Sequence, residues 1–354
     1  MLDTIDVCFQ DGLFFIILGF SQKECFSLAV HIFTVSEENY KVCVENGLVA
    51  IPEAKEGQRH DNIMDGLLSR LSGIKEDDYV LMYIIRSKLL RGVWQIEGRP
   101  FYEETPVWQD RLYPFRCRIK WSKYNFQKAL KLDDINDLRN IGKIWTWALE
   151  RSTGTNSMFS ISKGEFLILL TELMKIYPFS TQKGRILKPY PFHDSNIVEL
   201  LHFQNSSPRY EFTIMALLNN EFAKGSYTEI FGNYSDFLCY VPTNLGKEMD
   251  FLLMYDNPLS AGEIVSYDII EVKRDDFDEE ALRQLISYES WFLQKKVSGD
   301  SNMVRTTAIA KTYSADVIKY CSQRTRIENK PIKLLQYTYE NGSLKLVDIT
   351  KQLM

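Results

Sequence analysis

The sequence predicts a multidomain mixed protein of the α+β or α/β class. Its 354 residues are enough for two or three domains. β-Branched and aromatic runs, broken by Gly, Pro and charges, fill the first third, and apolar residues at helical spacing fill the next stretch. Helix-like and strand-like segments then alternate to the C-terminus, in the order αββαβαβ, which is typical of a mixed α/β domain.

We place the domains at residues 1–122, 123–200 and 201–354. In the first, strands are predicted at 77–85, 92–102 and 115–121, and a short amphipathic helix at 60–74. The second is a helical connector with helices at 132–151 and 162–178, followed by a linker at 177–196 that contains Pro, Gly and Lys. Its second helix opens with a capping box, Ser162-x-x-Glu165.

The C-terminal segment supplies most of the expected regular structure. The elements are a helix at 208–223, strands at 248–256 and 263–273, a helix at 278–296, a strand at 304–313, a helix at 314–325 and a hairpin at 332–349.

Composition excludes some classes of protein. The six cysteines form no Cys-x-x-Cys pair, which argues against a zinc cluster or a disulfide framework, and the four histidines show no metal-ligand or triad spacing. The net charge of −5 does not indicate a nucleic-acid binder, although it is compatible with a local basic face. No apolar run reaches membrane-spanning length, and 13–20 lacks a basic leader, so we expect a soluble, cytoplasmic protein.

Charges interrupt the apolar run at 263–273. If it pairs as a hairpin with 248–256, Asp250 falls roughly opposite Glu271, and Lys273 shares the face of Glu271. Two carboxylates can hold Mg²⁺, with Mn²⁺ as a substitute, and a lysine can orient or deprotonate water or stabilise a transition state. An exposed strand with Glu and Lys two apart is the simpler alternative.

Helical residues could complete such a site. Gln284 and Tyr288 are four apart and share a helix face, where they could position water or a DNA backbone. Glu211, on the preceding helix, could serve as a third carboxylate. The alternative is a solvated or packed helix face for each of them.

The series "GKEMDFLL", "IIEVKR" and "ALRQLISYESWF" resembles the PD-(D/E)xK nuclease superfamily, and within it the catalytic domain of NucS-type endonucleases. The resemblance covers about 205–320 and implies a restriction-endonuclease-like core. It implies Asp250 and Glu271 as metal ligands, Lys273 as the catalytic lysine, and Gln284 and Tyr288 lining the site. Glu211 aligns with a first-helix glutamate, with Glu221 as a rival. Other members dimerise, so a homodimer is compatible with the resemblance.

Residues 77–121 resemble the second half of an EVE domain, a member of the PUA-like group, with "GVW", "PFYEETPVW" and "YPFRCRIKW" in order. The resemblance implies a small β-barrel that binds a flipped-out or modified base between aromatic side chains. The candidates are Tyr83, Trp94, Tyr102 and Trp108. Leu48 and Val49 stand where EVE sequences usually place a tryptophan.

The sequence therefore predicts a magnesium-dependent DNA endonuclease, restriction-like, whose N-terminal domain selects modified or unusual DNA. Three alternatives stay open: a repair endonuclease for mismatched or branched DNA, a non-catalytic nucleic-acid-binding protein on a nuclease scaffold, and an interaction protein that uses its connector helices.

Overall fold

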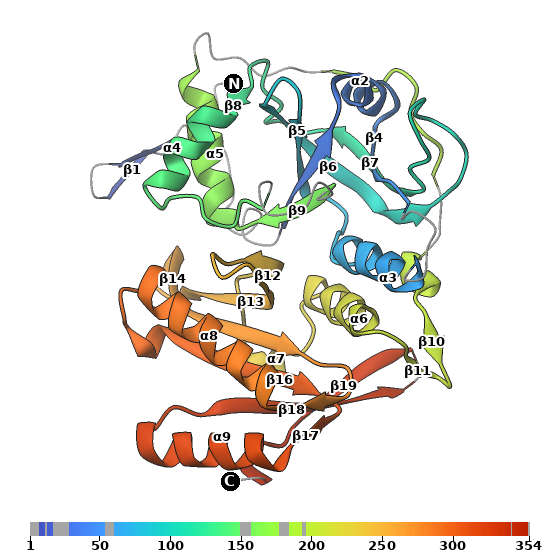
Figure 1. Cartoon of the computed structure of the whole chain (residues 1–354). Coiled ribbons are helices and arrows are strands. Elements are labelled where there is room, and N and C mark those ends of the chain that lie inside the picture. The colour runs from blue at the N-terminus through green and yellow to red at the C-terminus, as the bar shows by residue number, and fades with distance from the viewer. Residues whose placement is uncertain are drawn as a thin grey trace.

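The computed structural model describes residues 7–10, 13–16, 28–53, 60–148, 157–176, 184–192, 196–340 and 342–352. Within these ranges the protein is a mixed α+β structure with two large sheets (Figure 1). The blue-to-green half of the chain carries one sheet and the yellow-to-red half carries the other. None of the helices in these ranges has the length and apolar character that a membrane crossing requires.

The N-terminal sheet has seven strands in the order β4-β7-β6-β5-β3-β9, and β8 pairs with β6. The strands are β3 (Val30–Val35), β4 (Leu48–Ile51), β5 (Tyr79–Ile84), β6 (Leu89–Tyr102), β7 (Phe115–Trp121), β8 (Leu130–Lys131) and β9 (Met158–Ile161). The expectation of a small β-barrel is wrong: in the described ranges this sheet is open, with β4 and β9 at its two edges. A separate hairpin joins β1 (Val7–Gln10) to β2 (Leu13–Ile16).

Both faces of the N-terminal sheet are buried. Val80 and Met82 on β5 enter one core cluster, and Leu81 and Tyr83 enter another, as the two-residue period of a strand requires. The helices of this half are α2 (Glu37–Asn46), α3 (His60–Leu71), α4 (Leu132–Asn140) and α5 (Lys163–Lys175).

The helices of the expected connector are only partly as predicted. Helix α5 begins with the predicted capping box, since the Ser162 hydroxyl accepts from the Glu165 N–H. The helix predicted at 132–151 ends at Asn140, because Gly142 adopts a left-handed backbone with φ 76°. Strand β9 also lies in this stretch and pairs with β3. The three-domain division itself stays a prediction.

The C-terminal sheet has six strands in the order β12-β13-β14-β16-β18-β19. They are β12 (Asp236–Pro242), β13 (Glu248–Asn257), β14 (Ser260–Val272), β16 (Val304–Ala310), β18 (Ile332–Glu340) and β19 (Ser343–Asp348). The central pairs β14–β16 and β16–β18 are parallel, and the outer pairs are antiparallel. Short pairs β10 (Phe203–Gln204) with β11 (Ser207–Pro208) and β15 (Asp276–Phe277) with β17 (Thr312–Tyr313) flank it.

Helices cover both faces of this sheet. They are α6 (Glu211–Ala223), α7 (Thr228–Phe231), α8 (Glu279–Lys295) and α9 (Ala315–Glu328). On one face Leu285 and Phe292 of α8 share a core cluster with Ile269 of β14. On the other face α6 packs against β13 and β14 through Leu218, which shares a cluster with Phe251 and Ile270.

Helices α3 and α6 join the two halves and lie side by side between the sheets (Figure 1). Asp65 of α3 is 0% exposed and accepts hydrogen bonds from the Thr213 hydroxyl and from the backbone N–H and the ring of His202. Asn219 Nδ2 donates to the Ser69 carbonyl at 2.8 Å. Because these polar groups are buried and paired across the junction, separating the halves would leave them without partners.

Candidate carboxylate site

The site forms where β13 begins and β14 ends. The register pairs Phe251 with Ile270, and continuing it by one step places Asp250 opposite Glu271, as the sequence analysis expected. The strands extend into the expected loop 256–263, and Asn257 already pairs with Ser260. The hairpin turn is therefore shorter than predicted, and register shifts between Tyr255 and Asn257 absorb the difference.

Direct contacts hold the charged groups together. The Val272 N–H donates to Asp250 Oδ2 at 2.8 Å. Lys273 Nζ donates to Glu271 Oε1 at 2.8 Å and lies 3.5 Å from Glu211 Oε1. Lys273 thus links a carboxylate on the end of a strand to one on the first residue of α6.

Glu271 is the most enclosed of these groups. Its side chain is 0% exposed, and Oε2 has no hydrogen-bond partner among the described residues. Burial raises the pKa of Glu271 to about 7, although Lys273 opposes the rise. Burial, followed by the neighbouring Glu271 carboxylate, holds the pKa of Asp250 well above its usual range.

Lys273 is a cation at neutral pH. Burial lowers its pKa, but the Glu271, Asp250 and Glu211 carboxylates outweigh burial and raise it above the ordinary value. Lys273 therefore acts here as a donor and a positive charge. The roles considered from the sequence, in which Lys273 orients or deprotonates water, stay predictions.

Helix α8 contributes the two polar residues that the sequence predicted. Asp278 caps the helix by accepting from the Ala281 N–H at 2.9 Å. Gln284 Nε2 donates to the Tyr288 hydroxyl at 2.9 Å, and that hydroxyl donates to the Glu248 carbonyl at 2.7 Å. Burial raises the pKa of Tyr288, with Glu271 and Asp250 adding to the rise, so its hydroxyl stays protonated.

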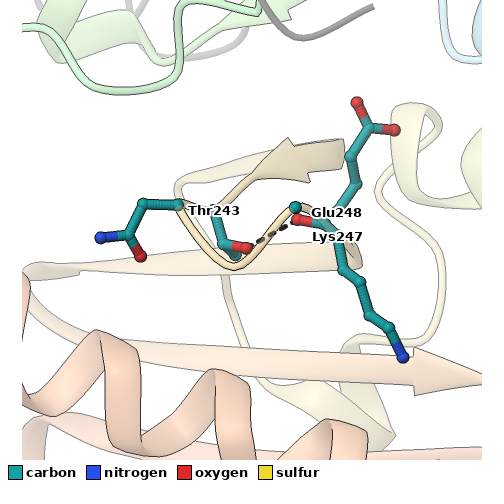
Figure 2. A pocket seen from close by; sticks show the side chains of 5 residues that line it. Thr243, Lys247 and Glu248 are labelled. Atoms are coloured by element: carbon teal, nitrogen blue, oxygen red, sulfur yellow. Dashed lines mark hydrogen bonds between the residues drawn. The ribbon is translucent and has the colours of Figure 1, made fainter.

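An open pocket of about 510 Å³ adjoins the site, in the loop between β12 and β13. Its lining includes Thr243, Lys247 and Glu248 (Figure 2). The Thr243 hydroxyl donates to the Lys247 carbonyl at 2.6 Å, which closes the loop. Figure 2 shows Lys247 and Glu248 pointing to opposite sides of this loop. Lys247 donates to Gln284 of α8, and Glu248 meets Arg70 of α3 at 3.4 Å.

The structure distinguishes the two glutamates that the sequence left as rivals. Glu211 lies beside Lys273 at the N-terminus of α6. Glu221 lies near the other end of α6 and bonds Lys224 at 2.7 Å and Ser226 at 2.8 Å. Glu211 is therefore the glutamate that reaches the carboxylate site.

The residues present fit a hard divalent cation. Within the described ranges no three His, Cys, Asp or Glu side chains already stand around one point as a metal cluster. Mg²⁺, however, is held in many enzymes by one or two carboxylates, with waters and substrate phosphate completing its shell. The partnerless oxygen of Glu271 beside Asp250 supplies that kind of donor set.

The four aromatic candidates of the N-terminal half do not converge on one pocket. Tyr83 is buried in the cluster with α5, whereas Trp94 and Trp108 are buried in the cluster on the other face of the sheet. Tyr102 is half-buried, and its hydroxyl donates to Glu104 at 2.7 Å. Tyr102 is thus the most accessible of the four.

Two residues near the site were missed from the sequence. Lys247 lies within the "GKEMD" motif without a predicted role, and its ammonium donates to Gln284 Oε1. Tyr240 lies on β12, a strand that was not predicted, although "DFLCYVP" is an apolar run of the right length. A continuous apolar run of this length, bounded by Asp236 and Pro242, is the signal that would have found the strand.

No protein-family model and no curated protein matches this chain. The Mmi1 YTH domain matches at 14% identity and a TM-score of 0.27, over 41% of this chain and 74% of that one. The YTH domain of the Zygosaccharomyces rouxii MRB1 protein, in complex with N6-methyladenosine RNA, matches at 13% and 0.27, over 44% and 90%. A complex of EndoMS with double-stranded DNA matches at 14% and 0.24, over 42% of this chain and 49% of that one. The chain thus shares weak, partial similarity with YTH domains and with EndoMS, at TM-scores that carry no argument about its activity.

Proposed function

We propose that this chain is a metal-dependent DNA endonuclease that hydrolyses phosphodiester bonds, with Asp250 and Glu271 holding Mg²⁺ or Mn²⁺. The observation that supports it is the buried Glu271 Oε2, which has no donor among the described residues and lies beside a second carboxylate. A buried carboxylate oxygen without a partner costs free energy, and a bound cation offsets that cost. A divalent ion held there would lower the pKa of water and offset the charge on a phosphate.

The neighbouring side chains have matching roles in this proposal. Protonated Lys273, fixed by Glu271, would donate to an oxygen of the scissile phosphate and stabilise the charge that develops on it. Gln284 and Tyr288 would hold water or the DNA backbone at the side of α8. Glu211 would orient Lys273 and add a carboxylate at the edge of the site.

Selection of the substrate belongs to the N-terminal part in this proposal. Contacts to phosphate fix the position of DNA but carry no sequence information, so a second element must choose the target. Residues 1–122 would recognise modified or unusual DNA, with Tyr102 as the accessible aromatic. A homodimer would let one site act on each strand.

The experiment is cleavage of plasmid and modified phage DNA in Mg²⁺ or Mn²⁺. Wild type and Asp268→Asn, a buried carboxyl bonded to Thr307 away from the site, should cut. Asp250→Ala and Lys273→Ala should leave the DNA intact. If the four proteins give the same digestion pattern, the endonuclease proposal is wrong. A panel of mismatched, branched and modified duplexes then separates repair from restriction.

One observation favours a second candidate, a non-catalytic nucleic-acid-binding protein. Lys273 already contacts Glu271 and Glu211, so these carboxylates have a cation without a metal. This candidate predicts that Asp250→Ala binds DNA as the wild type does, and that calorimetry with Mn²⁺ gives no binding heat. Saturable Mn²⁺ binding that Asp250→Ala abolishes would exclude it.

A further inference from the structure

Strand β12 contains a residue whose backbone does not belong in a strand. Tyr240 has φ +55°, in the left-handed region, in the middle of an extended segment. For a bulky residue other than glycine this conformation is an outlier and costs free energy. Such strain persists only where surrounding contacts enforce it, and it is frequent near functional sites.

The position of Tyr240 relates it directly to the carboxylate site. Cys239 pairs with Phe251, and Val241 pairs with Met249. The register therefore places Tyr240 opposite Asp250, and the ladder skips this one pair. The strained residue of β12 and the carboxylate of β13 interrupt the sheet at the same step.

The sheet changes face at this step on both strands. Residues two apart in a regular strand lie on the same face. Cys239 and Phe251 nevertheless lie on the α6 side, whereas Val241 and Met249 lie in the cluster of α8. We call this step, with the left-handed backbone of Tyr240, the kink. Because of the kink, Asp250 does not follow the regular alternation of faces, and its carboxylate accepts a hydrogen bond from the Val272 N–H of the next strand at 2.8 Å.

Side chains of α3 and α6 hold the kink from the far side. Tyr240 is 8% exposed, and its hydroxyl is hydrogen-bonded to the Ser69 hydroxyl. The Arg70 guanidinium lies 4.2 Å from the ring centroid, and the ring of Phe212 lies 6.2 Å away. A relaxed strand backbone would turn the ring out of these contacts and onto the α8 face.

We propose that Tyr240 is a positioning residue: its left-handed backbone, held by α3, aims the Asp250 carboxylate at the end of β14. As regards metal binding this rests on the proposed function, but the orientation of Asp250 is independent of it. The N-terminal half thereby contributes to the site through Ser69 and Arg70 without touching substrate.

The experiment compares two substitutions that both remove the ring. Tyr240→Gly keeps easy access to positive φ, whereas Tyr240→Val opposes it. The amide hydrogen-exchange rate of Val272 reports its hydrogen bond to Asp250, and it can be measured without any metal. The rate in Asp250→Ala gives the reference for complete loss of that hydrogen bond. Exchange in Tyr240→Val should be about tenfold faster than in Tyr240→Gly, with Mn²⁺ affinity about tenfold weaker. Should Tyr240→Val fail to fold, Tyr240→Ala takes its place with the same expected order.

Tyr227 provides the matched control, because it also has a positive φ of 61° but lies before α7 and bonds the Leu344 carbonyl. Tyr227→Gly and Tyr227→Val should leave Val272 exchange as in the wild type. Equal exchange in Tyr240→Gly and Tyr240→Val would overturn the positioning role, whatever the protein cleaves. Different exchange in a protein that binds no Mn²⁺ would sustain the positioning role and refute the proposed endonuclease.

Discussion

Replacing Glu271 with glutamine separates the charge of this buried carboxylate from its shape. The side chain is 0% exposed, and burial raises its pKa to about 7 from an ordinary 4.5. The folded protein then holds this proton more tightly than the unfolded chain, so this group stabilises the fold at low pH. That stability is lost as pH rises from about 4.5 through about 7. Each pKa unit is worth about 1.36 kcal/mol, so ionisation costs the fold about 3 kcal/mol.

Glutamine does not titrate, so Glu271→Gln should gain about 2–3 kcal/mol in unfolding free energy relative to the wild type between pH 5 and pH 8. Equilibrium urea unfolding in EDTA, repeated across this range, measures the difference. The two proteins would give parallel profiles if Glu271 were ionised throughout or open to solvent. That outcome would refute the placement of a buried carboxyl group with a raised pKa at this position.

Mg²⁺ should raise the urea midpoint of the wild type and of Asp268→Asn but not of Glu271→Gln. The rise should be larger at pH 8 than at pH 5, because protons compete for the same oxygens; equal rises in all three proteins would contradict this. Tyr288→Phe should cost about 1–2 kcal/mol, since it removes the donor to the Glu248 carbonyl, and an unchanged urea midpoint would count against that bond. Asp65→Ala should lower the unfolding free energy by about 2–4 kcal/mol, because it leaves His202 and Thr213 without their acceptor at the α3–α6 junction. Asp65→Asn should recover part of this loss, as measured by thermal unfolding.

Local signals in the sequence predicted much of the secondary structure. The Ser162 capping box, which the sequence predicted, marks the start of α5. The predicted helix 278–296 begins at Asp278, whose side chain caps α8. Counting outward from the hairpin loop placed Asp250 roughly opposite Glu271, although the predicted loop, 256–263, is longer than the turn between Asn257 and Ser260. The register shifts between Tyr255 and Asn257 change the offset between the two strands near the turn, and no local sequence signal predicted them.

What escaped prediction depends on tertiary contacts. The apolar spacing of 132–151 continues past Asn140, which is why a longer helix was predicted. Ile144 and Trp147 instead lie in an irregular segment after the helix ends, and their side chains are buried in the core there. No sequence rule places a tyrosine at φ +55°, because contacts from distant residues, among them Ser69 and Arg70, hold that conformation. The packing of α3 on α6 likewise joins segments some 150 residues apart in sequence.

The charge balance at the end of β14 is the feature that any account of this protein must explain. The carboxylates are Glu211, Asp250 and Glu271. Lys273 contacts Glu211 and Glu271 and acts electrostatically on Asp250, and the Lys247 ammonium also acts on Glu271. An approaching phosphate would add negative charge to a group that already has an excess, so it must bring a cation or find the carboxyls protonated. Because the pKa of Glu271 lies at about 7, a proton and a divalent cation compete for this carboxylate near neutral pH. A site built only to bind nucleic acid has no use for a buried carboxylate oxygen without a donor, such as Glu271 Oε2, beside a second carboxylate. A site that recruits a divalent ion together with phosphate would use that oxygen as a metal ligand. This difference favours the proposed endonuclease over the non-catalytic nucleic-acid-binding protein.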